Sequence, residues 1–227
     1  MKNLFRAITL AGIMVLVVAC APKKDVNPDL LDTPGYTRTD NNLHQIDGPP
    51  PGTEDAFRLY RSGAPPQETF AKWCKELGIK RAIVMSGDAE EYELAYQDEG
   101  ICPGVEVIYN VKQDHNQPVS DGFLKWFDKQ IEKARQDKVG ILFRCYTGSH
   151  RAGRLAAYYQ MKYQGLNSDE AIAVMTHKGM MMSLFNIVLI PQVRAMEDYI
   201  QGRPCGEIER MCVEKNSDKW MPKDRGL

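Results

Sequence analysis

The sequence predicts an α/β protein with a central, mostly parallel sheet flanked by helices. Short apolar or alternating segments, typical of strands, recur between longer amphipathic segments, typical of helices. Such alternation favours parallel strands joined by helices. With 227 residues and 43% hydrophobic content, the chain can build one domain with a substantial core. An excess of helical segments after residue 145 places several helices on one side of the sheet.

Strand and helix alternate at the start of the predicted domain. Residues 57–63 (FRLYRSG) predict a short strand, and residues 65–78 predict a helix with one apolar face that ends at Gly78. The apolar run within residues 79–87 predicts a buried strand. Residues 88–100 predict a helix, because their acidic first turn suits the helix dipole.

Two further strands enclose a long helix. Residues 105–111 alternate in polarity and are β-branched, which predicts a strand. Residues 120–138 have the spacing of a long amphipathic helix. Residues 139–145 (VGILFRC) form a continuous apolar run, which predicts a central strand buried on both faces.

The last part of the chain predicts helices only. Residues 151–165 form the first of them, which Gly165 ends. The next covers residues 167–179, with Asn167 or Ser168 as its N-cap. The last runs from about residue 182 to residue 200 and is interrupted near Pro191.

Residues 1–19 predict an export signal. Lys2 and Arg6 precede an apolar run that is short for a membrane span. The run ends in Val-Val-Ala-Cys, which resembles the lipobox of bacterial lipoproteins and implies cleavage before Cys20 and lipidation of its thiol. We therefore expect an exported lipoprotein, periplasmic or anchored in the outer membrane. An ordinary signal peptide and a short anchor helix are the alternatives.

Residues 20–52 predict a tether that partly packs on the domain at its end. They are rich in Pro, Asn, Asp and Gly and have no apolar period. The folded domain is therefore expected over residues 53–227. The net charge of −1 argues against a nucleic-acid partner, although a local basic pocket for an anion is compatible with it.

Five cysteines remain if Cys20 carries a lipid, and an odd number in an exported protein leaves one thiol unpaired. The short separation of Cys205 and Cys212 suggests a local disulfide, with Cys74–Cys102 as the other pair. The alternative is that all these thiols are reduced and buried. No cluster has the spacing of metal ligands, so we expect neither a metal nor another cofactor.

The loop between the central strand and the following helix has the composition of an anion site. It reads Cys145, Tyr146, Thr147, Gly148, Ser149, His150, Arg151. Free N–H groups at a helix start can surround an anion, and the helix dipole favours negative charge there. Gly148 permits a strained turn, and the planar fork of Arg151 can hold two phosphate oxygens. The same field favours the thiolate of Cys145, a nucleophile if phosphate binds beside it.

Cys-x5-Arg in this setting resembles the signature of the cysteine-based protein tyrosine phosphatase superfamily. The resemblance extends from about Phe57 to Gln201 and implies the fold of that superfamily. It also implies a phosphatase in which Cys145 forms a phosphocysteine intermediate. Arg151 and the loop residues between the two would bind the phosphate.

Such a reaction needs an acid that protonates the leaving oxygen. Asp114 lies 31 residues before Cys145, just after the predicted strand 105–111. The sequence Asp114-His115-x-x-Pro118 resembles the acid loop of the tyrosine-phosphatase-like phytases. The resemblance implies that Asp114 is the general acid and that its carboxylate then activates water. A solvated loop aspartate is the alternative.

Residues 59–85 also resemble the entry segment of small dual-specificity and phytase-like phosphatases, which would place Arg61 near the rim of the site. Arg61 as a structural, salt-bridged arginine is the alternative. Two positions depart from the superfamily. Arg144 stands where His is usual, and it either faces the thiol or points away. Ala152 replaces a Ser or Thr whose hydroxyl assists the departing thiolate, which affects turnover more than phosphate binding.

Inositol polyphosphates are the expected substrates, because export favours them over phosphoproteins and several bases are candidates for contacts with a second phosphate. A tyrosine or dual-specificity protein phosphatase is the first alternative. A phosphate-binding module without turnover is the second, and a rhodanese-like transferase would explain Asp114 and Arg151 less well. The candidate contacts for a second phosphate are His115, His150, Arg154, Lys112, Arg61 and Arg58.

Overall fold

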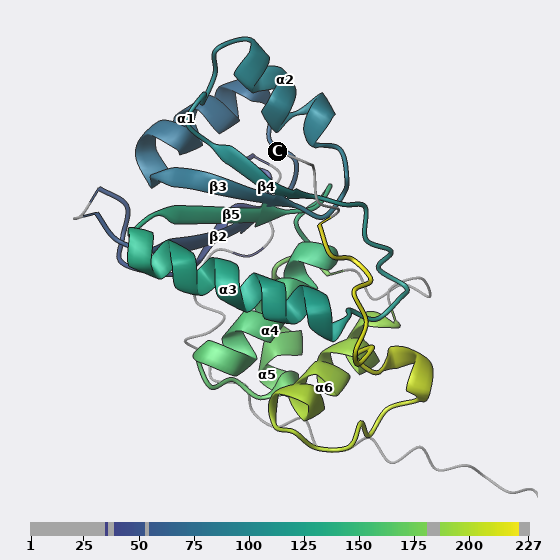
Figure 1. Ribbon diagram of the computed structural model, residues 1–227. Coiled ribbons are helices and arrows are strands. Elements are labelled where there is room, and N and C mark those ends of the chain that lie inside the picture. Colours follow the sequence, from purple (N-terminus) through teal and green to yellow (C-terminus); the bar gives the residue numbers. More distant parts are fainter. Residues whose placement is uncertain (1–34, 36–38, 53–54, 181–186, 223–227) are drawn as a thin grey trace, which may run out of the picture.

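The computed structural model describes residues 35, 39–52, 55–180 and 187–222. A five-stranded sheet lies between two layers of helices (Figure 1). The predicted signal and Cys20 lie outside the described residues. Within the part that is described, no helix is both long and apolar enough to cross a membrane.

The sheet has the strand order β1-β2-β5-β3-β4. Its strands are β1 (His44–Asp47), β2 (Arg58–Ser62), β3 (Ile79–Val84), β4 (Glu106–Asn110) and β5 (Gly140–Arg144). β5 pairs in parallel with β2 and β3, and β4 in parallel with β3. All residues of β5 are buried. The prediction of a mostly parallel sheet around a buried central strand is confirmed.

Strand β1 lies within the residues predicted as a tether. It pairs antiparallel with β2 at the edge of the sheet, with His44 opposite Arg61. The sequence His-Gln-Ile-Asp is short and mostly polar, so it has no apolar alternation by which to recognise a strand. Asn42, just before the strand, is 1% exposed. The end of the predicted tether thus packs on the domain, as an edge strand of its sheet.

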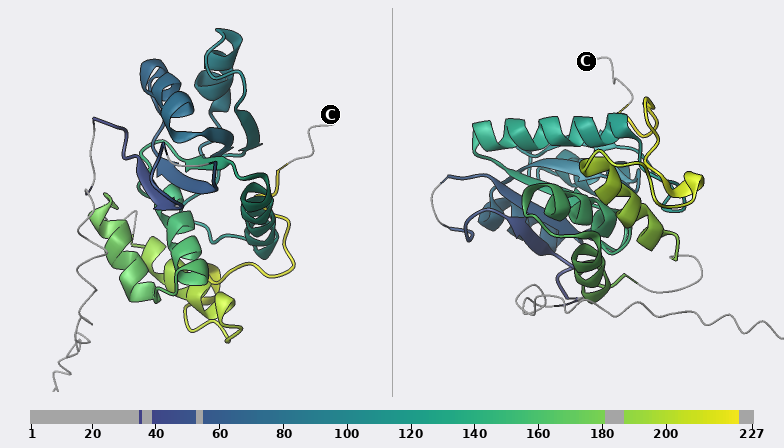
Figure 2. Two further views of the ribbon diagram at one scale, coloured as in Figure 1. Left: turned by 90° about the vertical axis from the view of Figure 1, so that its left-hand side faces the viewer. Right: turned by 90° about the horizontal axis from the view of Figure 1, so that it is seen from below.

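The helices divide unequally between the two faces of the sheet (Figures 1 and 2). One face is covered by α1 (Gln67–Leu77) and α2 (Glu93–Asp98). The other is covered by α3 (Asp121–Asp137), α4 (Arg151–Tyr163), α5 (Ser168–His177) and α6 (Leu189–Ile200). This arrangement confirms the predicted helical excess on one side. Asn167 caps α5, and Gly78 ends α1 in a left-handed conformation with φ +67°.

Two helices differ from the prediction. The segment 88–100 is divided into a 3₁₀ turn over Ala89–Glu91 and the helix α2, because Tyr92 between them leaves helical geometry with φ −129° and ψ −97°. Helix α6 begins at Leu189, and Pro191 lies in its first turn, where a missing N–H breaks no helical hydrogen bond. The expected start of this helix near residue 182 lies outside the described residues.

Side chains of β5 alternate between the two layers, and this alternation orients the loop that follows. Phe143 and Cys145 belong to the apolar cluster packed against α3 and α4. Leu142 belongs to the cluster on the α1 face. Because successive residues of a strand point to opposite faces, Arg144 points toward α2 and Cys145 toward α4.

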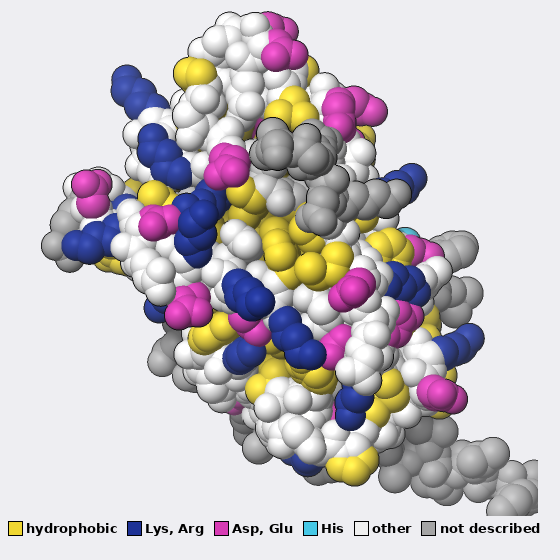
Figure 3. Space-filling model, viewed as in Figure 1, with side chains coloured by type: hydrophobic (Ala, Val, Ile, Leu, Met, Phe, Trp, Pro, Cys, Tyr) yellow, Lys and Arg dark blue, Asp and Glu magenta, His cyan; other side chains and the backbone are white. Residues whose placement is uncertain are grey.

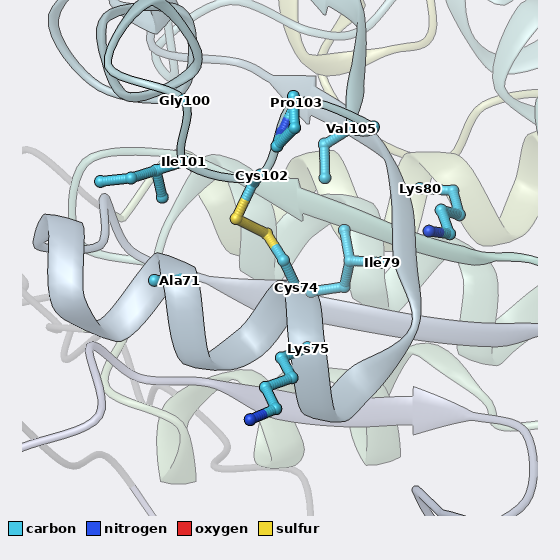
Figure 4. A pocket seen from close by; sticks show the side chains of 11 residues that line it. Ala71, Cys74, Lys75, Ile79, Lys80, Gly100, Ile101, Cys102, Pro103 and Val105 are labelled. Atoms are coloured by element: carbon cyan, nitrogen blue, oxygen red, sulfur yellow. A yellow bond between two sulfur atoms is a disulfide. The ribbon is translucent and has the colours of Figure 1, made fainter.

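The described cysteines leave one free thiol. Cys74 and Cys102 form a disulfide, which lines a hollow on the α1 side of the sheet with Lys75 close by (Figure 4). Cys205 and Cys212 form a second disulfide near the C-terminal end. Cys145 is free and buried.

On the face in Figure 3, basic and acidic side chains are interspersed over α3.

Candidate active site

The loop that follows β5 exposes unpaired backbone donors. Cys145, at the carboxyl end of the strand, is 2% exposed, and its N–H donates to Ser62 O at 3.4 Å. Within the described part of the chain, four following residues donate their N–H groups to no protein acceptor. These residues are Tyr146, Thr147, Gly148 and His150. Together with the free N–H groups of the first turn of α4, they can bind an anion beside the thiol.

Two glycines allow the loop to fold against the end of β2. Gly148 has φ +75°, and a Cβ added there would lie 2.6 Å from Gly63 N. A Cβ added to Gly63 would lie 2.9 Å from Tyr146 O. Both positions therefore exclude a side chain. Ser62 and Gly63, which follow directly from the predicted strand 57–63, thus form the back of the loop.

Arg151 begins α4 and closes the loop. Its Nη1 donates to Met85 O at 2.9 Å and to Gln113 O at 3.4 Å. These contacts join the end of β3 and the segment after β4 to the loop. Its Nε and Nη2 groups donate to no acceptor among the described residues. The guanidinium therefore keeps an edge available for phosphate oxygens.

The structure brings the predicted acid loop to the same place. Asp114 is half-buried, and its Oδ1 accepts from Asn116 N–H at 2.9 Å, which forms a tight turn. The His115 ring lies 6.2 Å from the His150 ring, so the acid loop borders the Cys145 loop. Burial lowers the pKa of both histidines, which favours their neutral form at pH 7.

Three side chains fix the acid loop from behind. Arg154 Nη1 donates to Gln117 O at 2.7 Å, and Trp220 Nε1 donates to Pro118 O at 3.1 Å. Gln192 Nε2 donates to His115 O at 3.2 Å. These contacts leave no signal in the sequence, because Gln192 and Trp220 come from distant segments and lie in no recognisable motif.

Several candidate contacts for a second phosphate are buried or lie away from the Cys145 loop. Arg154 is 1% exposed and binds the acid loop instead. Arg61 is also 1% exposed, so its predicted place at the rim is wrong. Arg58 lies at the opposite end of β2, where it donates to Pro49 O at 3.0 Å. Lys112, in contrast, is exposed at the start of the acid loop.

Asn42 supports the loop, although nothing in its sequence context pointed to it. Its Nδ2 donates to Lys178 O at 3.0 Å and to Thr147 O at 3.3 Å. Its Oδ1 lies 2.7 Å from His44 Nε2. Burial, aided by Lys178 and Arg61, lowers the pKa of His44 to about 3, so the neutral ring can donate this hydrogen bond.

Arg144 points away from the thiol and holds α2. It is fully buried, and its Nε donates to Glu93 Oε1 at 2.6 Å, while its Nη2 pairs with Glu93 Oε2. Its Nη1 donates to Ser86 Oγ at 2.8 Å and to Asp88 Oδ1 at 2.5 Å. The side chain at this position is therefore structural.

We expect Glu93→Gln to lower the free energy of unfolding by about 3–5 kcal/mol, because it leaves the buried Arg144 charge without its main partner. Urea unfolding followed by circular dichroism would measure the loss. Glu91→Gln, at an exposed neighbouring position, is the control and should change stability by less than about 0.5 kcal/mol. A loss no greater than that of the control would contradict this role.

Comparisons with known proteins identify the fold. No family model and no curated protein matches the sequence. P. aeruginosa TpbA is 19% identical with a TM-score of 0.51, over 74% of this chain and 95% of that one. Tk-PTP in its active form is 20% identical with a TM-score of 0.50, over 67% and 96% of the two chains. PTPMT1 in complex with PI(5)P is 14% identical with a TM-score of 0.52, over 70% and 97%. The chain thus has the predicted fold of the cysteine-based tyrosine phosphatase-like proteins.

Proposed function

We propose that this protein is a cysteine-dependent phosphatase that hydrolyses phosphoric monoesters without a metal ion. The observation that supports this most is the free Cys145 thiol at the base of a loop with unpaired N–H groups. Arg151 closes the loop, and its Nε and Nη2 groups remain available as donors to phosphate. Fixed dipoles and one guanidinium can neutralise a phosphoryl group, which is the task that a metal has in other phosphatases.

The reaction then has two steps. Cys145 Sγ attacks phosphorus, and the bond from phosphorus to the leaving oxygen breaks while the Asp114 carboxyl donates a proton to that oxygen. The Asp114 carboxylate next takes a proton from water, whose oxygen attacks the phosphocysteine. The P–S bond breaks, and phosphate and the thiolate are released. Ala152 offers no hydroxyl to this thiolate, so we expect the second step to be the slower one.

We propose inositol polyphosphates as the substrate class. The acid loop resembles that of the phytases. The exposed Lys112 offers a charge there, and the neutral rings of His115 and His150 offer hydrogen bonds. PTPMT1, which has the same fold, binds PI(5)P. Since Arg154 and Arg58 are engaged elsewhere, additional phosphates would rely on Lys112, His115 and His150.

A phosphotyrosine protein is the second candidate substrate. The Tyr146 side chain is 64% exposed beside the nucleophile and offers an aromatic surface to a phenol ring. A variant of TpbA, again with the same fold, was solved in complex with pTyr. This aromatic contact would replace the charge contacts that inositol phosphates require.

Phosphate release from a substrate panel tests the proposed function. We expect inositol hexakisphosphate to be cleaved faster than a phosphotyrosine or phosphoserine peptide, and EDTA to leave the rate unchanged. Added salt should weaken the preference, because additional phosphates bind through charge. Preference for the phosphotyrosine peptide would favour a protein phosphatase. Phosphate binding without release from any substrate would indicate a binding module.

We further propose that the protein is exported and anchored to a membrane by a lipid on Cys20, which the resemblance to the lipobox supports. Cys20→Ala should then move the protein from the membrane fraction to the soluble exported fraction. Immunoblots of the two fractions would measure the change. A wild-type protein that is already soluble after export would contradict the proposal.

A further inference from the structure

Arg61 lies behind the Cys145 loop, on the same face of the sheet as the thiol. In the parallel pair of β2 and β5 it is in register with Phe143, two residues before Cys145. Its neighbour Leu59 packs in the same cluster as Phe143 and Cys145. A Cβ added to Gly153 would lie 3.6 Å from Arg61 Nη1. The guanidinium therefore contacts the first turn of α4, beneath the anion site.

This buried cation has no carboxylate partner among the described residues. Arg61 is 1% exposed, its Nη2 donates to Lys178 O at 3.1 Å, and its Nε has no hydrogen-bond partner. Burial lowers the pKa of Arg61 to about 10, so the group keeps its charge at neutral pH. Arg144, on the other face of the sheet, is also buried, but its charge is balanced by the carboxylates of Asp88 and Glu93. A buried charge without a counter-ion is costly unless an anion faces it.

The titratable groups near Arg61 and the loop are mostly cations or neutral histidines. The cations are Lys178, Arg151 and Arg154, and burial favours the neutral form of His44, His115 and His150. The Asp114 carboxylate acts on two of these groups, His115 and Arg154. The anions that remain to balance Arg61 are those of the reaction itself.

We infer that Arg61 is a positioning residue whose charge stabilises, from behind the loop, the Cys145 thiolate and the phosphoryl group bound above it. Neither anion needs to touch the guanidinium, because a unit charge acts over several ångströms where water is excluded. The inference rests on the proposed function.

Alkylation by iodoacetamide tests this role without any turnover. In a Cys20→Ala chain, Cys145 is the free thiol of the described residues, so the alkylation rate between about pH 5 and pH 9 reports its ionisation. We expect Arg61→Gln to react about tenfold more slowly than the parent near pH 6, because the thiolate then lacks this stabilising charge, and at a similar rate near pH 9. Arg58→Gln removes another buried arginine from the far end of β2 and should leave the rate unchanged.

Folding of each variant is verified by circular dichroism. A folded Arg61→Gln variant with the parent's pH dependence would overturn the inference. If that variant unfolds, the alkylation of Arg61→Lys tests the inference instead. A lysine keeps the charge, so this variant should keep the parent's pH dependence. A folded Arg61→Lys variant with slowed alkylation near pH 6 would overturn it as well. Absence of phosphatase activity would contradict the proposed function and leave this readout unaffected.

Discussion

Replacing Cys145 by Ser should lower phosphate release by at least about 10⁴-fold and leave phosphate binding intact. Serine keeps the loop geometry, because the side chain is similar in size and the unpaired N–H groups belong to the backbone. Its hydroxyl, however, is a much weaker nucleophile than a thiolate at neutral pH. Steady-state release of phosphate would measure turnover, and the rise in melting temperature with added phosphate would measure binding.

An acid quench with ³²P-labelled substrate isolates the covalent step. The wild type should retain label on the protein, since the second step is expected to be slow, and Cys145→Ser should retain none. Arg58→Gln, far from the loop, serves as the control and should keep both label and turnover. Turnover of Cys145→Ser within about tenfold of the wild type would exclude Cys145 as the nucleophile.

Asp114→Asn should lower the turnover of inositol hexakisphosphate by about 10²–10⁴-fold, because an inositol alkoxide departs poorly without a proton. The loss should be much smaller for para-nitrophenyl phosphate, whose leaving group is stable as an anion. Asparagine keeps the Oδ1 that accepts from Asn116 N–H, so the turn of the acid loop is preserved. The ratio of kcat values for the two substrates is the measurement.

This ratio also distinguishes a role of Asp114 in proton transfer from a role in shaping the acid loop. Equal losses on both substrates would show that Asp114 only shapes the loop. Asn116→Ala is a suitable comparison, since it changes an exposed side chain of the same turn and should affect both substrates little and equally.

The elements around the site were largely predictable, because their signals are local. β5 is a continuous apolar run, and Cys145, Gly148 and Arg151 stand at fixed spacing after it. Strand β1 escaped detection, because an edge strand buries little and needs no apolar alternation. The error over Arg61 and Arg154 has another origin: a sequence shows which residues carry charge but not whether their donors point outward or inward.

The hydrogen bonds that hold the Cys145 loop and the acid loop from distant parts of the chain could not be predicted at all. Asn42 reaches Thr147 across 105 positions of the chain, and Trp220 reaches Pro118 across 102. Such pairs bring together residues from segments whose own composition says nothing of a site. Their detection required the fold, which sets the distance between them.

The attachment of the acid loop by Arg154, Gln192 and Trp220 has an entropic consequence. A loop that must close over each substrate loses conformational freedom in every catalytic cycle, and the rate falls accordingly. In this protein, folding has already restricted that freedom, so Asp114 is placed before the substrate arrives. If Asp114 is the general acid, as proposed, this attachment removes the need for a loop to close in each cycle, and a bulky, highly charged substrate would enter and leave without waiting for that movement.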